Sequence, residues 1–391
     1  MITGTPDKIY RVSWPYFWLD DKKNEPNANW VIFLGADFKN MSVDQDVFAK
    51  KTNQCLDYVK KNCPDCTLIY RPHPDEKNES SLLNLDGFSV QKDGQIAETF
   101  LWANRNKIKY VFSVCSTSSI AGFNLGLNAY SFYPYARDVF KDIRKIFTDK
   151  YFSGLPSGFF IQDLNKPLLE NRFELTEDKQ ITKNFKSVLS EHKGPIWFTI
   201  VENRLILAVI GLARMIKKIS PKREVNLIVS GHHRWSNKYL KELGGQFDKV
   251  MVFPRHFYSL KPTKILSAFL GARKIKNFKI ENDSILIGFA HHDFVENCFM
   301  SCNKDKFKIA FLSEKIWELN FRVRELGIDP KTFIFNKAGW FYNKFFEPLL
   351  GLNKTVFSHY GGEDKFVFIK YQKPIEEVYD EVYLMKNFPN G

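Results

Sequence analysis

The sequence lacks the motifs by which nucleotide-binding proteins are most often identified. No G-x-G-x-x-G follows the first apolar run, because the loop after it reads LGADFKN. No G-x-x-x-x-G-K-[ST] occurs anywhere in the 391 residues. These absences argue against a dinucleotide-binding domain of the usual kind and against a P-loop protein.

Cysteine is scarce, and its spacing argues against redox or metal chemistry. The chain has six cysteines, and its C-x-x-C is CPDC, from Cys63 to Cys66. It closes a predicted helix and precedes a predicted strand, whereas a thioredoxin-type motif opens a helix after a strand. Zinc would need a second pair, and Cys298 and Cys302 are poorly spaced for one. We expect no metal and no redox cofactor, and the expected location is the cytoplasm because no signal peptide opens the sequence.

No uninterrupted hydrophobic run is long enough to span a bilayer. The most apolar stretch, residues 196–219, is interrupted by Glu202, Asn203 and Arg204. The part that follows is too short for a transmembrane helix. We expect a buried or interdomain helix here, with interfacial membrane contact as the alternative because the stretch ends in basic residues.

Acidic residues are outnumbered by basic ones, 44 to 57, which leaves a formal net charge of +13. Such a surface attracts anions: nucleic acid, acidic lipid headgroups, or phosphorylated and carboxylated substrates. Local basic concentrations at residues 218–223 and 261–279 are typical of a solvated face or of contact with an anionic inner membrane. Neither a helix-turn-helix nor an RNA-binding aromatic motif is present, so we expect no nucleic-acid partner.

Short apolar runs alternate with helical patterns along most of the chain, which predicts βα units and parallel sheets. We therefore expect an α/β protein with two Rossmann-like domains. The first would cover residues 1–194, including an aromatic lead-in segment, and the second residues 195–391. The predicted strands lie at residues 29–35, 66–72, 87–91, 109–114, 128–133, 225–231, 249–254, 283–290, 308–313, 332–337 and 354–359, with a terminal helix at 374–388.

The stretch YRPHP ends the second predicted strand and places two cationic side chains there. Arg71 and His73 follow the strand, and Pro74 suits the first turn of a helix, where its missing N–H costs nothing. A helix amino terminus offers amides and partial positive charge to a phosphate. His73 can donate to a phosphate oxygen or to a leaving group. The alternative is a turn with two prolines and a surface histidine.

The stretch CSTSS follows the strand predicted at 109–114 and opens a helix. One hydroxyl is enough for an N-cap, and this stretch offers four, which favours a phosphate cradle. Both motifs end strands of one domain, at the edge where α/β sheets bind ligands. The candidate donor-binding residues are Arg71, His73, Pro74, Ser116, Thr117, Ser118 and Ser119.

An HP corner followed by a serine/threonine cluster resembles the donor site of bacterial sialyltransferases, capsule polysaccharide transferases and β-Kdo transferases. The resemblance covers roughly residues 29–135. It implies a GT-B-like, metal-independent glycosyltransferase that uses a CMP-activated 3-deoxy-ulosonic acid. It also implies that His73, Pro74, Ser118 and Ser119 bind the CMP phosphate.

Two departures from the sialyltransferase pattern bear on the donor. The motifs lie in the N-terminal half, whereas sialyltransferases carry them in the C-terminal half. The acidic D/E-D/E-G motif is absent, because YGGED at 360–364 has a different order. The arrangement is more similar to β-Kdo transferases, so the resemblance implies transfer of Kdo from CMP-Kdo to a lipid-linked surface glycan. We also expect a peripheral contact with the anionic inner membrane.

The catalytic carboxylate is not fixed by these motifs. Asp37 follows the first predicted strand, and Asp293 and His292 follow a strand of the second domain. A retaining transferase needs a carboxylate nucleophile, and an inverting one a general base. The pairs of adjacent histidines do not indicate zinc, because neighbouring side chains point in different directions.

The sequence leaves four other functions open. A sialyl or other nonulosonic acid transferase would use the same kind of CMP donor, and a teichoic-acid-type glycerophosphotransferase also carries an HP corner but uses CDP-glycerol. A basic nucleic-acid-binding protein is a different class, and would show binding that falls steeply with salt. A non-catalytic glycan-binding module would bind sugar without nucleotide.

Overall fold

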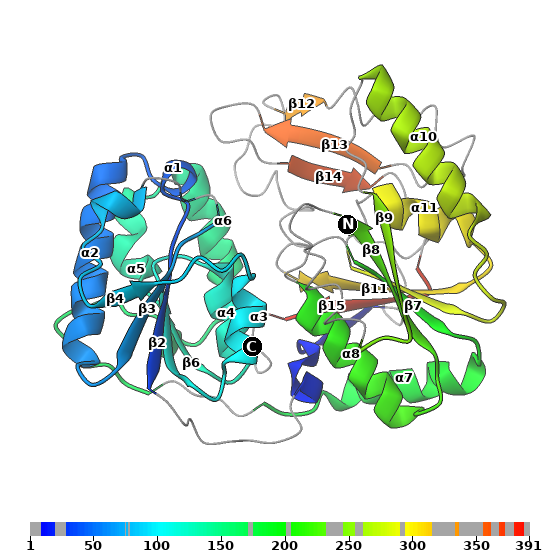
Figure 1. Cartoon of the computed structure of the whole chain (residues 1–391), viewed down its shortest axis with the longest axis horizontal. Helices are drawn as coiled ribbons and strands as arrows, with labels where there is room; N and C mark the ends of the chain where they lie inside the picture. Colours follow the sequence, from blue (N-terminus) through cyan, green and yellow to red (C-terminus); the bar gives the residue numbers. More distant parts are fainter. Residues whose placement is uncertain are drawn as a thin grey trace. The chain divides into compact units, whose positions relative to one another are not determined.

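The structure is a computed structural model, and it describes residues 9–19, 29–74, 76, 79–170, 175–200, 205–231, 245–254, 261–289, 294–314, 333–335, 355–360, 367–371 and 379–386. The chain divides into two compact units. The five-stranded unit comprises Asp20–Glu177 and Asn387–Gly391, and the seven-stranded unit comprises Met1–Leu19 and Asp178–Lys386. Each unit contains a parallel sheet with helices packed on it (Figure 1).

The five-stranded unit has the strand order β4-β3-β2-β5-β6, with every neighbouring pair parallel. Its central strands are almost fully buried, because helices cover both faces of a parallel sheet. In Figure 1, α2 lies on one side of this sheet and α3 and α4 lie on the other. The elements are β2 (Trp30–Leu34), α1 (Phe38–Met41), α2 (Gln45–Asn62), β3 (Thr67–Arg71), β4 (Phe88–Val90), α3 (Ala97–Ala103), β5 (Ile108–Ser113), α4 (Thr117–Asn124), β6 (Asn128–Ser131), α5 (Tyr133–Ala136) and α6 (Asp142–Phe152).

The seven-stranded unit has the strand order β1-β15-β11-β10-β7-β8-β9, again parallel throughout. A separate antiparallel sheet contains β12 (Phe333–Phe335), β13 (Thr355–Tyr360) and β14 (Val367–Tyr371). The other elements are β1 (Ile9–Val12), α7 (Lys179–Glu191), β7 (Ile196–Ile200), α8 (Ile206–Ile219), β8 (Val225–Gly231), β9 (Lys249–Pro254), α10 (Pro262–Asn277), β10 (Ile285–Gly288), α11 (Phe294–Cys302), β11 (Phe307–Ser313) and β15 (Glu381–Met385).

The predicted pair of α/β domains with parallel sheets is confirmed, and the structure corrects their boundary. Residues 1–194 were expected in one domain, but β1 pairs in parallel with β15, and α7 belongs to the same seven-stranded unit. The described part of the lead-in segment therefore packs on the other unit. A short 3-10 helix, Pro15–Leu19, lies against α8, where a Cβ on Gly211 would overlap Pro15 O.

Two predicted helices are corrected as well. The apolar stretch 196–219 contains both β7 and α8, with residues 201–204 between them outside the described part. Most of α8 is buried, which confirms the expected buried helix over this part of the stretch. The predicted terminal helix at 374–388 contains β15 instead, which pairs with both β1 and β11.

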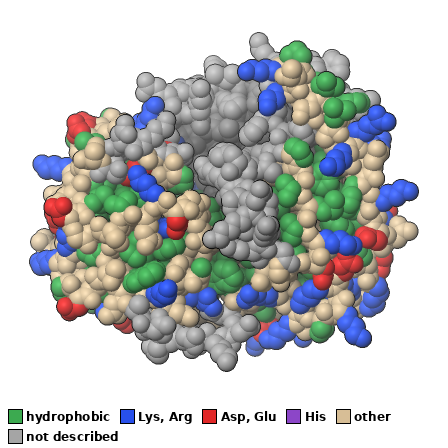
Figure 2. Space-filling view, in the orientation of Figure 1, with side chains coloured by type: hydrophobic (Ala, Val, Ile, Leu, Met, Phe, Trp, Pro, Cys, Tyr) green, Lys and Arg blue, Asp and Glu red, His purple; other side chains and the backbone are tan. Residues whose placement is uncertain are grey.

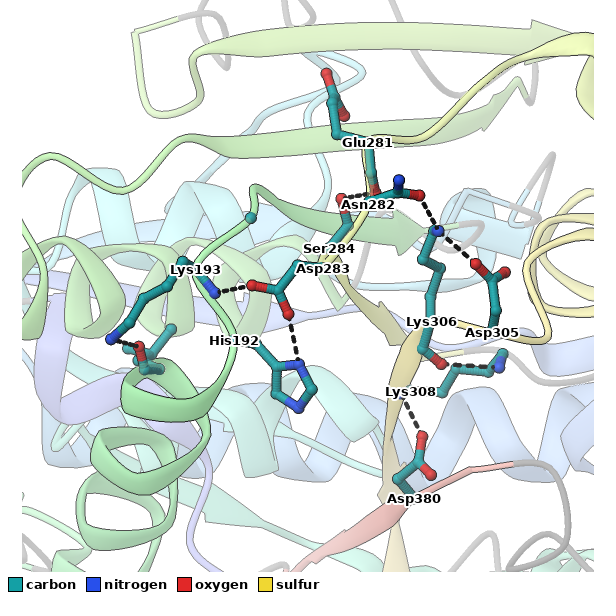
Figure 3. A network of polar contacts seen from close by, with 12 residues as sticks. His192, Lys193, Glu281, Asn282, Asp283, Ser284, Asp305, Lys306, Lys308 and Asp380 are labelled. Atoms are coloured by element: carbon teal, nitrogen blue, oxygen red, sulfur yellow. Dashed lines mark hydrogen bonds and ion pairs between the residues drawn. The ribbon is translucent and has the colours of Figure 1, made fainter.

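Polar residues tie together the amino ends of four strands in the seven-stranded sheet (Figure 3). They precede β7, β10, β11 and β15 directly in the sequence. Because side chains of this network join neighbouring loops, we assign the amino edge of this sheet a structural role. The contacts are His192 Nδ1–Asp283 Oδ1 (3.0 Å), Lys306 Nζ–Asn282 Oδ1 (3.1 Å), Lys306 Nζ–Asp305 Oδ2 (2.6 Å) and Lys308 N–Asp380 Oδ2 (2.7 Å).

Candidate phosphate-binding site

The strand order brings both sequence motifs to one edge of the five-stranded sheet. Strand β2 lies between β3 and β5 and runs parallel to both. Its last residue, Leu34, is in register with Arg71 on one side and with Ser113 on the other. The residues after Arg71 and after Ser113 therefore leave the sheet at the same carboxyl edge, which is the edge where α/β sheets bind ligands.

The backbone around His73 is held by a buried carboxylate. Glu76 is only 7% exposed, and its carboxylate accepts hydrogen bonds from Tyr70 OH at 3.0 Å and from the His73 amide at 3.1 Å. Burial, with the neighbouring Glu76 carboxylate second, raises the pKa of Tyr70 above its ordinary value. Tyr70 therefore stays a hydrogen-bond donor to Glu76, and Glu76 in turn holds the backbone of the turn through the His73 amide.

Pro74 does not begin a helix, contrary to the sequence prediction. The Glu76 amide donates to His73 O at 2.9 Å, which closes a turn over these residues, and Pro74 is exposed within it. Two prolines around one histidine favour a turn because their φ angles are fixed. The amino terminus of a helix is therefore offered to an anion at this edge by α4, rather than by the segment after Pro74.

Arg71 is engaged inside the five-stranded unit. Its guanidinium makes a bidentate pair with Asp93, with both N–O distances 2.9 Å, and donates to Gln95 O at 2.8 Å. It also stacks on the Phe100 ring, 3.9 Å from the ring centroid, and is only 7% exposed. The hydrogen bonds from Arg71 hold the pKa of Asp93 below its ordinary value. Arg71 thus anchors the loop before α3, where its guanidinium is paired with the Asp93 carboxylate.

The serine cluster divides into residues that build the helix start and one that faces solvent. Ser116 is the N-cap of α4 and accepts from the Ser118 amide at 3.2 Å. Ser119 is fully buried, and its hydroxyl donates to Ser116 O at 2.6 Å. Thr117 is exposed at the first position of the helix. The first-turn amides of α4 and the Thr117 hydroxyl are therefore the groups that this cluster offers to a ligand.

Ser118 connects the two motifs through α3. Its hydroxyl donates to Glu98 Oε1 at 2.8 Å, and Glu98 lies in the first turn of α3 with 7% exposure. Arg71 holds the loop directly before the same helix. The four hydroxyls predicted as a cradle therefore include one, on Ser118, that positions α4 against α3.

A cation that the sequence analysis did not select lies near the start of α4. Thr148 of α6 contacts Cys115, with 3.8 Å between Oγ1 and Sγ, and Arg144 precedes Thr148 by one helical turn. Burial raises the pKa of Cys115 to about 12, and the charge of Arg144 acts in the opposite direction. Cys115 is therefore a neutral thiol. The basic stretch around Arg144 is visible in the sequence, but its packing against the β5–α4 loop is not.

Of the candidate catalytic residues, the structure describes Asp37. Asp37 directly precedes α1 at the end of β2, is 9% exposed, and accepts from the Met41 amide through its backbone carbonyl at 3.0 Å. It follows the strand that lies between the two motifs, so its backbone position fits the prediction. His292 and Asp293, and the earlier pair His232 and His233, lie outside the described residues.

An open pocket of about 450 Å³ lies on the α3 side of the same unit. It shares Asp93 and Phe100 with the contacts of Arg71, so it adjoins the anchored loop rather than the turn at His73. Aromatic and amide side chains dominate its wall. The lining residues are Trp30, Gln91, Lys92, Asp93, Gln95, Phe100 and Asn104.

The described residues contain neither a metal-binding cluster nor a helix that could span a membrane. They contain no group of three or more histidine, cysteine, aspartate or glutamate side chains arranged to hold a metal ion. All six cysteines are free thiols. Among the described helices, none has both the length and the apolar character needed to cross a bilayer.

Comparisons with known proteins give only distant structural likenesses. No protein-family model matches the chain, and no curated protein matches it. A structure of the wall teichoic acid polymerase TagF, H444N with CDPG, matches with a TM-score of 0.19 and 10% identity over 75% of this chain and 73% of that chain. A glycosyl transferase family 9 structure from Veillonella parvula DSM 2008 matches with a TM-score of 0.18 and 8% identity over 75% and 83%. At these TM-scores the likenesses identify no family.

Proposed function

We propose that the chain is a glycosyltransferase that binds a CMP-activated sugar, with the donor phosphate at the carboxyl edge of the five-stranded sheet. The donor that we propose is CMP-Kdo, and the acceptor a bacterial surface glycan. The observation that carries the proposal is the strand order β3-β2-β5, which places the turn at His73 and the start of α4 at one edge. The resemblance of the HP and serine motifs to CMP-sugar transferases supports the choice of nucleotide.

The groups at this edge suit a phosphate. The amino end of α4 offers backbone amides and the positive end of the helix dipole. Thr117 adds an exposed hydroxyl, and Arg144 adds a positive charge near the preceding loop. The imidazole of His73 is part-exposed on a backbone fixed by Glu76. An anion at this edge would thus meet donors from two neighbouring loops.

The same groups suit the departure of CMP. In the proposed transfer, the bond between the anomeric carbon and the phosphate oxygen breaks, and its electron pair stays on the phosphate. The acceptor oxygen forms the new bond to the anomeric carbon, and its proton passes to a base. Charge develops on the phosphate as the bond breaks, so amides and His73 aimed at that oxygen stabilise the transition state more than the ground state.

We propose Asp37 as the carboxylate that takes the proton or assists the anomeric carbon. It follows β2, between the two strands that carry the motifs. Its short distance along the chain from Leu34 keeps it at this edge of the sheet. His292 and Asp293 stay as candidates from the other unit.

The test of the binding site is calorimetry with CMP on matched histidine variants. We expect His73→Ala to bind CMP about tenfold more weakly, because a hydrogen bond to a charged phosphate is lost. His192→Ala is the control, since His192 lies in the amino-edge network of the seven-stranded unit. Equal affinity of the parent protein and His73→Ala for CMP would refute the site.

The donor is tested separately, by turnover with CMP-Kdo, CMP-sialate and CDP-glycerol. We expect the parent protein to turn over CMP-Kdo. We expect Asp37→Asn to be inactive. Preference for CMP-sialate would move the function to a nonulosonic acid transferase, and preference for CDP-glycerol to a glycerophosphotransferase. Sugar binding without nucleotide would indicate a glycan-binding module instead.

A further inference from the structure

Helix α10 turns a hydrophobic ridge away from the core of its unit. Its buried face contains Ala268 and Ala272, which are fully buried. Leu266, Phe269 and Leu270 are 59%, 37% and 55% exposed. These three residues have the i, i+3, i+4 spacing that places side chains next to one another on a helix surface. With Ile275, which is also buried, these alanines pack the helix on its unit, and the large apolar side chains of the ridge are exposed.

The same helix carries positive charge and no negative charge. Its sequence, PTKILSAFLGARKIKN, contains no aspartate or glutamate. Lys264, Arg273, Lys274 and Lys276 are exposed. Figure 2 shows hydrophobic and basic side chains side by side in the region of α10. Arg273 and Lys274 lie three and four residues after Leu270, so they border the carboxyl end of the hydrophobic ridge.

We propose that α10 docks the seven-stranded unit on an anionic lipid bilayer. Leu266, Phe269 and Leu270 would enter the boundary between headgroups and acyl chains, and the surrounding lysine and arginine side chains would contact lipid phosphates. A helix with an apolar face and basic flanks binds in the plane of the interface in this way. Long basic side chains can keep their charges at headgroup level while their stems cover apolar surface.

A bilayer fits this surface better than a protein or a nucleic acid does. The ridge is narrow, and the cations that border its carboxyl end lack acidic neighbours on α10. A nucleic acid would use the charges and leave the leucines in water. The net charge of +13 also attracts the protein as a whole to an anionic surface.

Vesicle flotation tests the ridge and does not depend on the transferase function. The parent protein should bind vesicles of phosphatidylcholine with phosphatidylglycerol and bind weakly to phosphatidylcholine alone. Leu266→Ser with Leu270→Ser should lower the partition coefficient about tenfold or more, because two apolar side chains no longer enter the interface. Arg273→Ser with Lys274→Ser should lower it about fivefold for each charge removed.

Matched controls lie elsewhere on the surface. Val43→Ser removes an apolar side chain that is 76% exposed, and Lys183→Ser with Lys186→Ser removes two exposed charges from α7. Both should bind vesicles like the parent, and circular dichroism should show that all variants are folded. Equal vesicle binding by the leucine variant and the parent would overturn the proposal. So would a parent that ignores vesicles but forms dimers, or binds oligonucleotides, through the same residues.

Discussion

The Ser118 hydroxyl donates a hydrogen bond of 2.8 Å to Glu98 Oε1, and this contact joins α4 to the first turn of α3. The loop before α3 is in turn held by Arg71 through Asp93 and Gln95. The two sequence motifs are therefore linked through one helix. A substitution in one motif can therefore shift the other motif through α3, even when no ligand is bound.

Removing the Ser118 hydroxyl should destabilise the five-stranded unit. In Ser118→Ala, a carboxylate with 7% exposure loses a donor, and we expect the free energy of unfolding to fall by about 1–3 kcal/mol. Urea denaturation measures this change. Thr117→Ala is the control, because Thr117 is exposed and its substitution should change stability by less than about 0.5 kcal/mol. Unchanged stability of Ser118→Ala would show that the contact is not needed.

Gly35 should be intolerant of a side chain. A Cβ there would lie 2.5 Å from Glu76 Oε2, 2.7 Å from Tyr70 OH and 2.9 Å from the His73 amide. We expect Gly35→Ala to lower stability by about 1–3 kcal/mol, as overpacking does, and to weaken CMP binding because the turn at His73 must move. Thermal unfolding and calorimetry measure the two effects.

Gly122 is the matched glycine for this experiment. It lies inside α4, and a Cβ there would meet its nearest neighbour, Leu101, at 3.4 Å, an ordinary contact. Gly122→Ala should therefore be neutral or stabilise the unit by up to about 1 kcal/mol, since alanine favours a helix interior. If both alanine variants behave alike, the close approach at Gly35 has no energetic consequence.

The sequence predicted the five-stranded unit well because its buried strands read as short apolar runs between helical patterns. The runs at 29–35 and 66–72 contain β2 and β3 with only end residues in excess. Local patterning is enough for this kind of sheet, because each strand is buried on both faces and each helix follows its strand directly.

The errors arise where a strand depends on distant partners. In residues 374–388, which include β15, tyrosine and valine recur among acidic residues, and this pattern resembles an amphipathic helix. The segment forms a strand because β1 and β11 pair with it on either side. Its pairing with β1 joins residues more than 370 positions apart, as in Ile9 with Val382. No local pattern encodes such a contact.

The site shows the same division between local and distant information. The strand-end positions of His73 and Ser116 could be predicted, because hydrophobic runs locate the ends of strands. The engagement of Arg71 could not, because its partner Asp93 lies 22 residues later and nothing in YRPHP indicates it. Arg144 was missed for a similar reason, since only the packing of α6 brings it near α4.

Arg71 should matter for stability more than for nucleotide affinity. Arg71→Lys keeps a positive charge but loses the bidentate pair and the stacking on Phe100, so we expect a loss of about 2 kcal/mol. A double-mutant cycle with Asp93→Asn should show that the two losses are not additive. The folded fraction of Arg71→Lys should bind CMP within about twofold of the parent, a smaller change than that expected for His73→Ala. A selective loss of CMP affinity would instead place Arg71 in the donor site.

Asp283 should stabilise the seven-stranded unit near neutral pH, and this stabilisation should be lost in acid. The Lys193 amide, and after it His192, lower the pKa of its carboxyl by hydrogen bonding. A lowered folded-state pKa stabilises the native state fully above the ordinary pKa, and this stabilisation is lost as pH falls through the lowered value. Asp283 has φ of 63°, which asparagine tolerates, so Asp283→Asn removes the charge without new backbone strain. We expect its melting temperature to lie below that of the parent near neutral pH and to converge with it in acid. Asp86→Asn, an exposed change in the other unit, should follow the parent at every pH. A deficit of Asp283→Asn that is constant across pH would mean that packing, and not charge, is what Asp283 contributes.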